Sequence, residues 1–201
     1  MIIVVVGPSG VGKSTFIKAM DLPSEDYVYG TCQPMIEELI RRGVTVTHDT
    51  IFALSEEWCS QDPYWQITRI LAAKEGKRFL VVDGPRRLQE MVRLRTLSVR
   101  ILVVKITSEP ATRFQRLKER KRVSLTTLDE FQRLETDELS RMGLGAILNG
   151  PVDIVVRNSV SVSIRELETK GRRFGWLVKI LPSCLPKFVW VFLLRVSVSD
   201  F

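Results

Sequence analysis

The chain is poor in the residues that build metal centres, disulfide frameworks and histidine-based active sites. Its 201 residues include only three cysteines and one histidine. Cys32, Cys59 and Cys184 form no C-x-x-C pair, so we expect reduced thiols rather than a zinc site or a disulfide scaffold. We interpret His48, which stands beside Asp49, as a surface or helix-capping neighbour rather than a catalytic base.

Signals for export and for membrane insertion are also missing. Met1 leads directly into an apolar strand, with no basic segment and no cleavage site, so we expect no signal peptide. No apolar run reaches the roughly 20 residues that a spanning helix needs without being interrupted by lysine or proline. Together with the scattered cysteines, these absences predict a cytoplasmic protein.

The net charge of +7 is unevenly distributed along the chain. Residues 171–201 hold five basic residues and one acidic residue, which leaves +3 for residues 1–170. No stretch interleaves aromatic with basic residues, which argues against nucleic-acid processing such as end phosphorylation of a polynucleotide. A near-neutral body with a small basic excess fits an enzyme that handles two polyphosphate substrates.

The strongest positive signal lies at the N-terminus. Ile2–Val6 is an unbroken β-branched run, typical of a central strand buried on both faces. The next eight residues, 7–14, fit G-x-x-x-x-G-K-[ST], the Walker A or P-loop motif, and residues 16–20 can continue as a helix. Because strand, motif and helix agree, the sequence predicts a phosphate-binding loop rather than a glycine-rich turn.

The motif implies a specific chemistry. Its glycines allow the backbone to approach a ligand, so that main-chain N–H groups can bind phosphate oxygens. Lys13 is expected to contact the β- and γ-phosphates of ATP, and Ser14 to contribute a hydroxyl to Mg²⁺. The residues expected to bind the nucleotide are Gly7, Pro8, Ser9, Gly10, Val11, Gly12, Lys13, Ser14 and Thr15.

Strand patterns alternate with helix patterns along the rest of the chain. The clearest further strands are residues 26–30, 78–84, 101–106 and 152–156. This alternation predicts an α/β fold with a parallel sheet and helices on both faces. Ligands of such sheets bind outside the carboxyl ends of the strands, where the P-loop, Asp83 and Thr107 all fall.

A second candidate cluster follows the strand that ends at Asp83. An acid in this position commonly holds Mg²⁺ in P-loop enzymes, and Asp83 is also a candidate base if the acceptor is a hydroxyl. Arg86 or Arg87 is expected to clamp an acceptor phosphate, because a guanidinium binds two oxygens at once. The alternative is an acid that caps the next helix, followed by two solvated arginines.

A third cluster is a basic helical segment. Arg113, Arg116 and Arg120 recur at helical spacing and therefore share one face. Beside a phosphate site, such a face can neutralise the charge that develops during transfer, which makes Arg116 and Arg120 candidate catalytic residues with Lys13, Asp83 and Arg86. A solvated helix, partly balanced by acidic neighbours, is the alternative interpretation.

These residues together resemble the nucleoside-monophosphate-kinase-like branch of P-loop proteins. The segment Phe79–Gln89 resembles the D-G-x-P-R segment of adenylate kinases, with one residue fewer before Pro85. The body as a whole is more similar to dephospho-CoA kinases and to related archaeal nucleotide kinases. The similarity covers residues 1–170 and is carried by the P-loop, residues 82–86, residues 130–145 and residues 152–158.

The resemblance implies a three-layer α/β/α P-loop NTPase fold with a five-stranded parallel sheet in the order 2-3-1-4-5. It implies Mg-ATP as donor and a phosphate or hydroxyl as acceptor. It also implies a small arginine-bearing lid at residues 113–122 and a base-proximal loop near Asn158.

The leading hypothesis is therefore an ATP-dependent transferase that phosphorylates a nucleotide or small metabolite. The alternative is a P-loop NTPase that couples ATP hydrolysis to a protein or nucleic-acid partner. Such machines usually carry a water-activating glutamate after the strand acid, but Gly84 follows Asp83 here, and no Asn-Lys-x-Asp guanine motif is present. The acceptor region, residues 21–76, carries no recognisable signature.

Residues 171–201 differ in character from the kinase-like body at 1–170. Residues 174–194 combine apolar and aromatic clusters with lysines and prolines, and arginines flank them. This composition suits weak association with a membrane surface, self-association or packing against the body. We expect an appendage of unassigned role.

Overall fold

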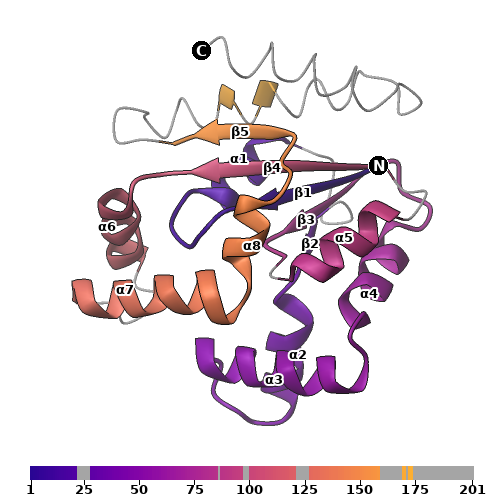
Figure 1. Ribbon diagram of the computed structural model, residues 1–201, viewed down its shortest axis with the longest axis horizontal. Coiled ribbons are helices and arrows are strands. Elements are labelled where there is room, and N and C mark those ends of the chain that lie inside the picture. Colours follow the sequence, from indigo (N-terminus) through magenta and orange to yellow (C-terminus); the bar gives the residue numbers. More distant parts are fainter. Residues whose placement is uncertain are drawn as a thin grey trace.

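The protein is described by a computed structural model for residues 1–21, 28–85, 87–96, 100–120, 127–158, 169–170 and 172–173. Its centre is one five-stranded parallel sheet in the order β2-β3-β1-β4-β5 (Figure 1). The strands are β1 (Ile2–Val6), β2 (Val28–Gly30), β3 (Leu80–Asp83), β4 (Ile101–Thr107) and β5 (Ile154–Arg157). The predicted fold class and strand order are confirmed.

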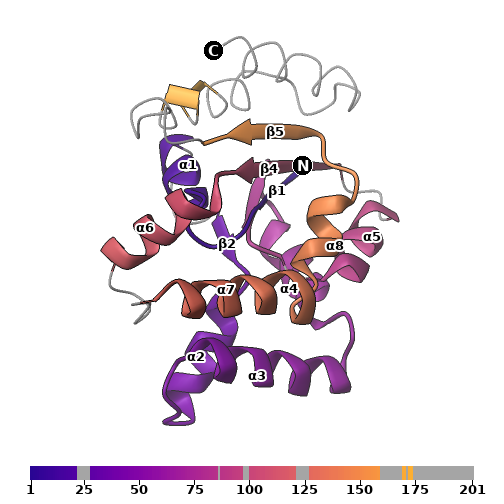
Figure 2. The same ribbon diagram turned by 60° about the vertical axis from the view of Figure 1, so that its left-hand side comes forward.

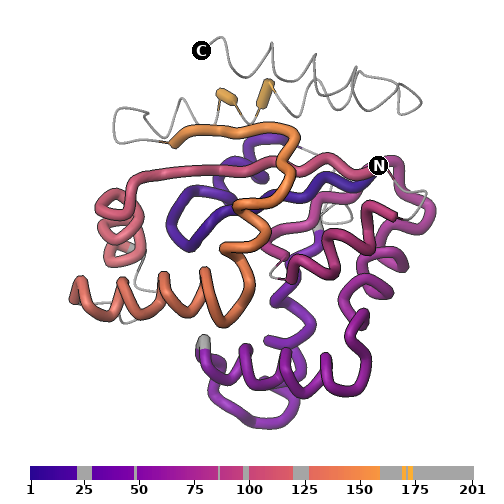
Figure 3. The backbone as a smooth tube through the Cα atoms, in the orientation of Figure 1, coloured from indigo at the N-terminus to yellow at the C-terminus, as the bar shows by residue number. Residues whose placement is uncertain are grey.

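Nine helical segments connect and flank the described strands. They are α1 (Lys13–Ala19), α2 (Gln33–Arg41), α3 (His48–Gln61), α4 (Trp65–Lys74), α5 (Leu88–Thr96), α6 (Pro110–Arg120), α7 (Leu128–Thr136), the π-helical turn η2 (Asp137–Arg141) and α8 (Leu144–Asn149). The backbone path in Figure 3 shows that α2 and α3 lie away from the sheet, below its carboxyl-end side.

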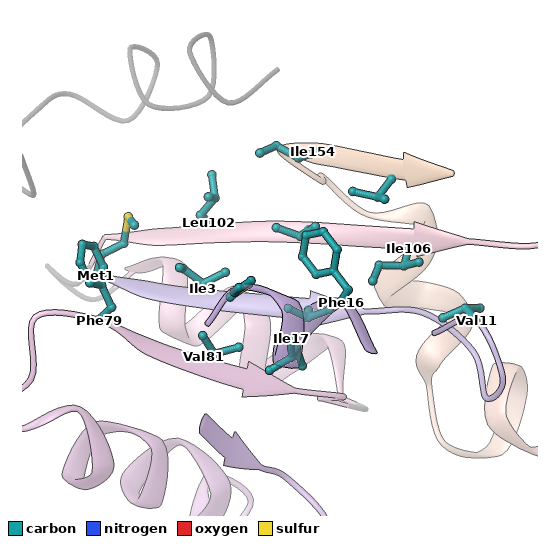
Figure 4. Close-up of a cluster of buried hydrophobic side chains, with 14 residues drawn as sticks. Met1, Ile3, Val11, Phe16, Ile17, Phe79, Val81, Leu102, Ile106 and Ile154 are labelled. Atoms are coloured by element: carbon teal, nitrogen blue, oxygen red, sulfur yellow. The ribbon is translucent and has the colours of Figure 1, made fainter. Parts of the chain in front are cut away.

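The two faces of the sheet carry separate apolar cores. All five residues of β1 are fully buried, because α-helices cover both sides of this central strand. On one face, Phe16 and Ile17 of α1 point onto Ile3 and Val81 (Figure 4). On the other face, α4, α5 and α8 pack onto the remaining strand residues. The continuous β-branched run at the N-terminus is thereby explained.

A smaller core joins α2 and α3 below the sheet (Figure 2). Met35 and Leu39 of α2 pack with Leu54 of α3 and with Trp65 at the start of α4. Trp65 also meets Trp58 edge to face, with ring centroids 4.7 Å apart. Both tryptophans are therefore packing residues of this core.

The sequence patterns predict helices over Thr50–Ser60, capped by Asp49 or Thr47, from Asp62, and from Thr127 to about Met142, and the described helices differ at all three places. Helix α4 begins at Trp65 rather than at Asp62. Helix α3 begins at His48, and its cap is Thr47, one of the two predicted caps, whose side chain accepts the N–H of Thr50. The long helix expected up to Met142 changes after Thr136 into the π-turn η2. A π-turn contains one residue more than an α-helical turn and often lies at a functional site. No local sequence pattern predicts it.

Several expectations concern residues outside the described ranges. They are Arg86, residues 164–168 of the helix that the sequence indicates over Ile164–Lys170, Lys121 and Arg122 of the expected lid, and the appendage apart from residues 172 and 173. Among the described helices, none is both long and apolar enough to cross a bilayer.

Glu90 of α5 is an unusual buried carboxyl. It is 1 % exposed, and within the described part of the chain neither of its oxygens has a hydrogen-bond partner. Burial raises the pKa of Glu90 to about 7, although the positive charge of Arg87 acts in the opposite direction. The folded state therefore holds this proton more tightly than the unfolded chain does.

We expect the stability of the protein to fall as the pH rises from about 5 to about 8. The contribution of protonated Glu90 is complete below the unfolded pKa and is lost as the pH passes about 7. Glu90→Gln should remove a pH dependence on the order of 2–3 kcal/mol in the free energy of unfolding. Chemical denaturation at several pH values measures this. Glu119→Gln, an exposed acid on α6, serves as control, and a Glu90→Gln profile parallel to the native one would contradict the assignment.

The sheet core can be tested with one substitution at two sites. Ile3 is fully buried in β1, whereas Ile40 of α2 is 65 % exposed. Ile3→Ala should lower the free energy of unfolding by about 2–5 kcal/mol, and Ile40→Ala should change it by less than about 0.5 kcal/mol. Urea denaturation distinguishes the two, and equal effects would contradict the described core.

Candidate active site

The P-loop follows β1 and packs between β4 and α6. A Cβ added at Gly7 would lie 2.6 Å from the Ile106 carbonyl oxygen, and one added at Gly10 would lie 2.8 Å from the Arg113 carbonyl oxygen. Both glycines also have positive φ, of 153° and 80°. Glycine is required at both positions because a side chain would meet backbone atoms that cannot move aside.

Helix α1 begins directly after this loop. Gly12 occupies its N-cap with φ 97°, and its carbonyl accepts the first helical bond from Phe16 N at 3.0 Å. Lys13 Nζ donates to the carbonyls of Gly7 at 2.7 Å and Pro8 at 3.2 Å, so the ammonium lies over the loop. Ser14 is exposed at the next position. Lys13 and Ser14 therefore both lie at the N-terminal end of α1, directly after the loop.

Asp83 ends β3 next to the P-loop. It pairs in register with Val5, and the following Gly84 N–H donates to the Val5 carbonyl at 3.1 Å. A Cβ at Gly84 would lie 3.9 Å from Lys13 Cε. Thr31 secures the same edge, since its hydroxyl donates to the Gly84 carbonyl at 2.7 Å. The predicted neighbourhood of Asp83 and the P-loop is thus present in the structure.

Arg116 and Asn158 support the P-loop from its other side. Asn158 is 2 % exposed, and its Nδ2 donates to the Val11 carbonyl at 2.6 Å. Its Oδ1 accepts from Arg116 at 3.1 Å, and the same guanidinium lies 3.5 Å from the Gly10 carbonyl oxygen. Two residues predicted from different segments therefore meet on the loop.

The three arginines of the basic helix differ in their surroundings. Arg113 is only 3 % exposed; it donates to Glu135 of α7 and lies 5.2 Å from the centre of the Phe131 ring. This contact fixes α6 to α7. Arg116 lies on the P-loop, while the side chain of Arg120, at the end of α6, is outside the described residues. Although Arg113 and Arg116 share one helix face, they contact different parts of the structure.

Glu138 of η2 is a site residue that the sequence reasoning missed. It is 2 % exposed, and its carboxylate accepts hydrogen bonds from the Ser9 backbone N–H at 2.9 Å and from the Ser9 hydroxyl. The two residues lie 129 positions apart, so neither local spacing nor a motif links them. A buried carboxylate thus holds the tip of the P-loop.

A cavity of about 340 Å³ is lined by residues that closely follow Thr31, Gly84 and Glu138 in the sequence, together with residues of α3. Its walls come from α2, α3, the segment after β3, and the η2–α8 region. Cys32, next to Thr31, lines one side, Arg87 lines another, and Ser140 and Arg141 follow closely after Glu138. Three of the lining segments therefore lie within a few residues of the P-loop contacts in the sequence, whereas the α3 residues Ile51, Phe52 and Ser55 do not.

The arrangement can hold a polyphosphate and a second molecule side by side. A P-loop lysine and glycine-rich backbone bind phosphate, and an adjoining carboxylate can act on a metal ion or accept a proton. Within the described ranges, no three His, Cys, Asp or Glu side chains gather closely enough to hold a metal by themselves. Mg²⁺ in phosphate-transferring sites usually takes one or two protein oxygens together with phosphate oxygens and water.

No protein-family model matches the chain, and no curated protein matches it in sequence. Solved structures do share its fold. A shikimate kinase from Bacteroides thetaiotaomicron is 16 % identical with a TM-score of 0.52, and the match covers 90 % of this chain and 99 % of that one. A gluconokinase from Sinorhizobium meliloti 1021 is 17 % identical with a TM-score of 0.50, covering 84 % and 87 %.

An uncharacterized protein from Eubacterium ventriosum ATCC 27560 is also similar, with 17 % identity, a TM-score of 0.53 and coverage of 84 % and 94 %. At these identities the similarity concerns the fold. The chain has the five-stranded parallel α/β fold that is found in these small-molecule kinases.

Proposed function

We propose that the protein is an ATP-dependent kinase that transfers the γ-phosphate of Mg-ATP to a small metabolite or nucleotide. The observation that supports this most is the convergence of the P-loop, Lys13 and Asp83 at one edge of the sheet. A cavity whose lining includes Cys32, next to Thr31, and Ser140, two residues after Glu138, offers room for an acceptor. Phosphoryl transfer depends mainly on placing donor and acceptor in line, and two adjoining sites provide that placement.

The donor site is built by the P-loop. Its backbone N–H groups and Lys13 bind the phosphates of ATP, and Lys13 exchanges its bonds to the carbonyls of Gly7 and Pro8 for phosphate oxygens. Because the ammonium already lies over the loop, only a short movement is needed. The binding free energy thus comes from groups that the fold holds in place.

Ser14 and Asp83 are the residues that would hold Mg²⁺. A hydroxyl and a carboxylate are hard oxygen donors of the kind Mg²⁺ prefers, and strand register puts Asp83 beside the loop that carries Ser14. When bound, the metal ion neutralises the charge on the transferred phosphate.

The transfer itself requires few protein groups. The acceptor oxygen forms a bond to the γ-phosphorus while the bond to the β–γ bridging oxygen breaks, and that electron pair leaves with ADP. A hydroxyl acceptor passes its proton to Asp83, whereas an ionised phosphate acceptor has no proton to pass. Arg86 and Arg120 remain candidates for stabilising the charge that develops, as the sequence predicts.

Arg116 and Asn158 act on the nucleotide side of the site. Both hold carbonyl groups of the P-loop, so they fix the direction in which its N–H groups point. We assign Asn158 to the adenine-proximal loop, and Arg116 to the α6 face that borders the nucleotide. In both positions, Arg116 and Asn158 also hold the P-loop in place through their hydrogen bonds to its carbonyl groups.

Glu138 sets the position of the P-loop tip. Two hydrogen bonds to Ser9 restrict a loop that is otherwise glycine-rich and costly to order. Its negative charge, however, lies close to where phosphates bind. The bonds favour nucleotide binding through preorganisation, and the charge opposes it.

Lys13→Ala should weaken ATP binding by about 10- to 100-fold, because a hydrogen bond to a charged group is worth about 1.5–3 kcal/mol. Titration calorimetry with Mg-ATP measures the affinity. Lys18→Ala, on an exposed position of the same helix, is the matched control and should bind like the native protein. Unchanged affinity in Lys13→Ala would overturn the donor site.

The kinase activity is tested by mixing the protein with Mg-ATP and a panel of nucleoside monophosphates, dephospho-CoA and small hydroxy acids. We expect ADP release that depends on one acceptor, with the phosphorylated product detected by mass spectrometry. Rapid ATP hydrolysis that no acceptor accelerates, but that a protein or nucleic-acid partner stimulates, would instead favour an NTPase.

Two substitutions at Glu138 separate its bonds from its charge. Glu138→Gln can keep both contacts with Ser9 without the charge, so the ATP affinity should stay equal or rise. Glu138→Ala loses both contacts and should lower the affinity about 10-fold. Calorimetry on both variants checks this, and stronger binding by Glu138→Ala than by Glu138→Gln would contradict the proposed role.

A further inference from the structure

The cavity beside the P-loop has a lining that restricts what it can accept. Its lining comes from α2 and α3 and from the η2–α8 segment, and Arg141 at the end of η2 lies against the Phe52 ring of α3. Its volume of about 340 Å³ is at the low end of the range of about 300–1,000 Å³ typical of small-molecule sites. A compact ligand is therefore expected.

Most of the described lining is apolar. Six of the apolar residues are Cys32, Met35, Ile51, Phe52, Leu88 and Met142. They come from four different segments and so surround the space rather than form one wall. Five lining residues, Ser55, Arg87, Gln89, Ser140 and Arg141, have polar side chains, so a ligand with many hydroxyl groups would regain only part of the hydrogen bonds that it makes with water.

Two arginines supply the charge of this lining. Arg141 lies with its guanidinium 4.7 Å from the centre of the Phe52 ring, and it pairs with Asp137 at 3.1 Å. Arg87, on the segment after β3, pairs with the exposed Glu56. Each guanidinium has five N–H donors, so one acidic partner leaves donor capacity for a ligand.

The acidic partners of these two arginines limit how much negative charge a ligand of the cavity can carry. Among the described residues, Asp137 and Glu56 each balance one of these two arginines, so the two ion pairs carry no net positive charge. A single anionic group can be held by the guanidinium donors, whereas a pyrophosphate or a nucleotide polyphosphate would lack compensation. Charge and volume thus point in the same direction.

We propose that the acceptor of this kinase is a compact, mostly apolar molecule, such as a ring, that carries one anionic group held by Arg141 and Arg87. This inference rests on the proposed function and narrows it. It separates the acceptor from polyhydroxylated acids and from dephospho-CoA. The apolar body lies against Phe52 and Met142, and the anionic group faces the guanidinium groups.

Two probes of the same ring size test the proposal. Both 3-hydroxybenzoate and shikimate carry one carboxylate on a six-membered ring, but the first is flat and has a single hydroxyl group. We expect the native protein, saturated with ADP and Mg²⁺, to bind 3-hydroxybenzoate about 10-fold or more tightly than shikimate in ligand-observed NMR titrations. Tighter or equal binding of shikimate would overturn the apolar assignment.

The charge assignment is tested with a variant and an uncharged probe. Arg141→Leu should weaken 3-hydroxybenzoate binding about 10-fold, while binding of 3-hydroxybenzyl alcohol, which lacks the carboxylate, should not change. Arg93→Leu, on an exposed position of α5, is the matched control and should bind both probes normally. Equal loss for both probes would show that Arg141 serves packing alone and would overturn the anion role.

The outcome can be separated from a failure of the kinase proposal. If ATP binds with the expected dependence on Lys13 but dephospho-CoA or a nucleoside monophosphate is the phosphorylated acceptor, the acceptor inference is wrong and the kinase stands. If ATP binding does not depend on Lys13, the donor site itself is wrong. Probe binding is measured without turnover, so it tests the acceptor inference whichever molecule is phosphorylated.

Discussion

The close approach of the P-loop backbone to its neighbours is the constraint on which the site depends. Gly7 faces the carbonyl of Ile106, and Gly10 faces the backbone of Arg113, at separations that leave no room for a side chain. Glu138 and Asn158 then hold the loop by hydrogen bonds from two further elements. A glycine-rich segment, which alone would be flexible, is ordered because four separate parts of the fold contact it.

This arrangement separates binding groups from supporting groups. Lys13 and Ser14 stand at the surface of the loop, whereas the residues behind it are almost completely buried. Glu138 and Asn158, two buried polar residues behind the loop, both have hydrogen-bond partners on it, as the low dielectric of the interior demands. The P-loop is thereby held in position before any ligand binds, which is the property that electrostatic catalysis of phosphoryl transfer requires.

The sequence predicted the features that depend on neighbouring residues. The β-branched run Ile2–Val6, the P-loop motif and the acid at the end of β3 are all local patterns, and the structure contains each of them. Glu138 could not be found this way, because its partner is 129 residues distant and its segment looks like an ordinary helix. Arg113 and Arg116 are three positions apart, yet only tertiary contacts decide that one fixes α6 to α7 and the other holds the loop.

The π-turn η2 sets the relation between the two halves of the site. Its extra residue rotates everything after it by about 100° compared with an uninterrupted α-helix. Glu138 lies within this turn and is directed to the P-loop, while Arg141 ends the turn and lines the cavity. The extra residue of this turn thus allows one short segment both to contact the P-loop through Glu138 and to line the cavity through Arg141. A relative that lacks a single residue here would keep the helix, but its side chains could not reach both the loop and the cavity.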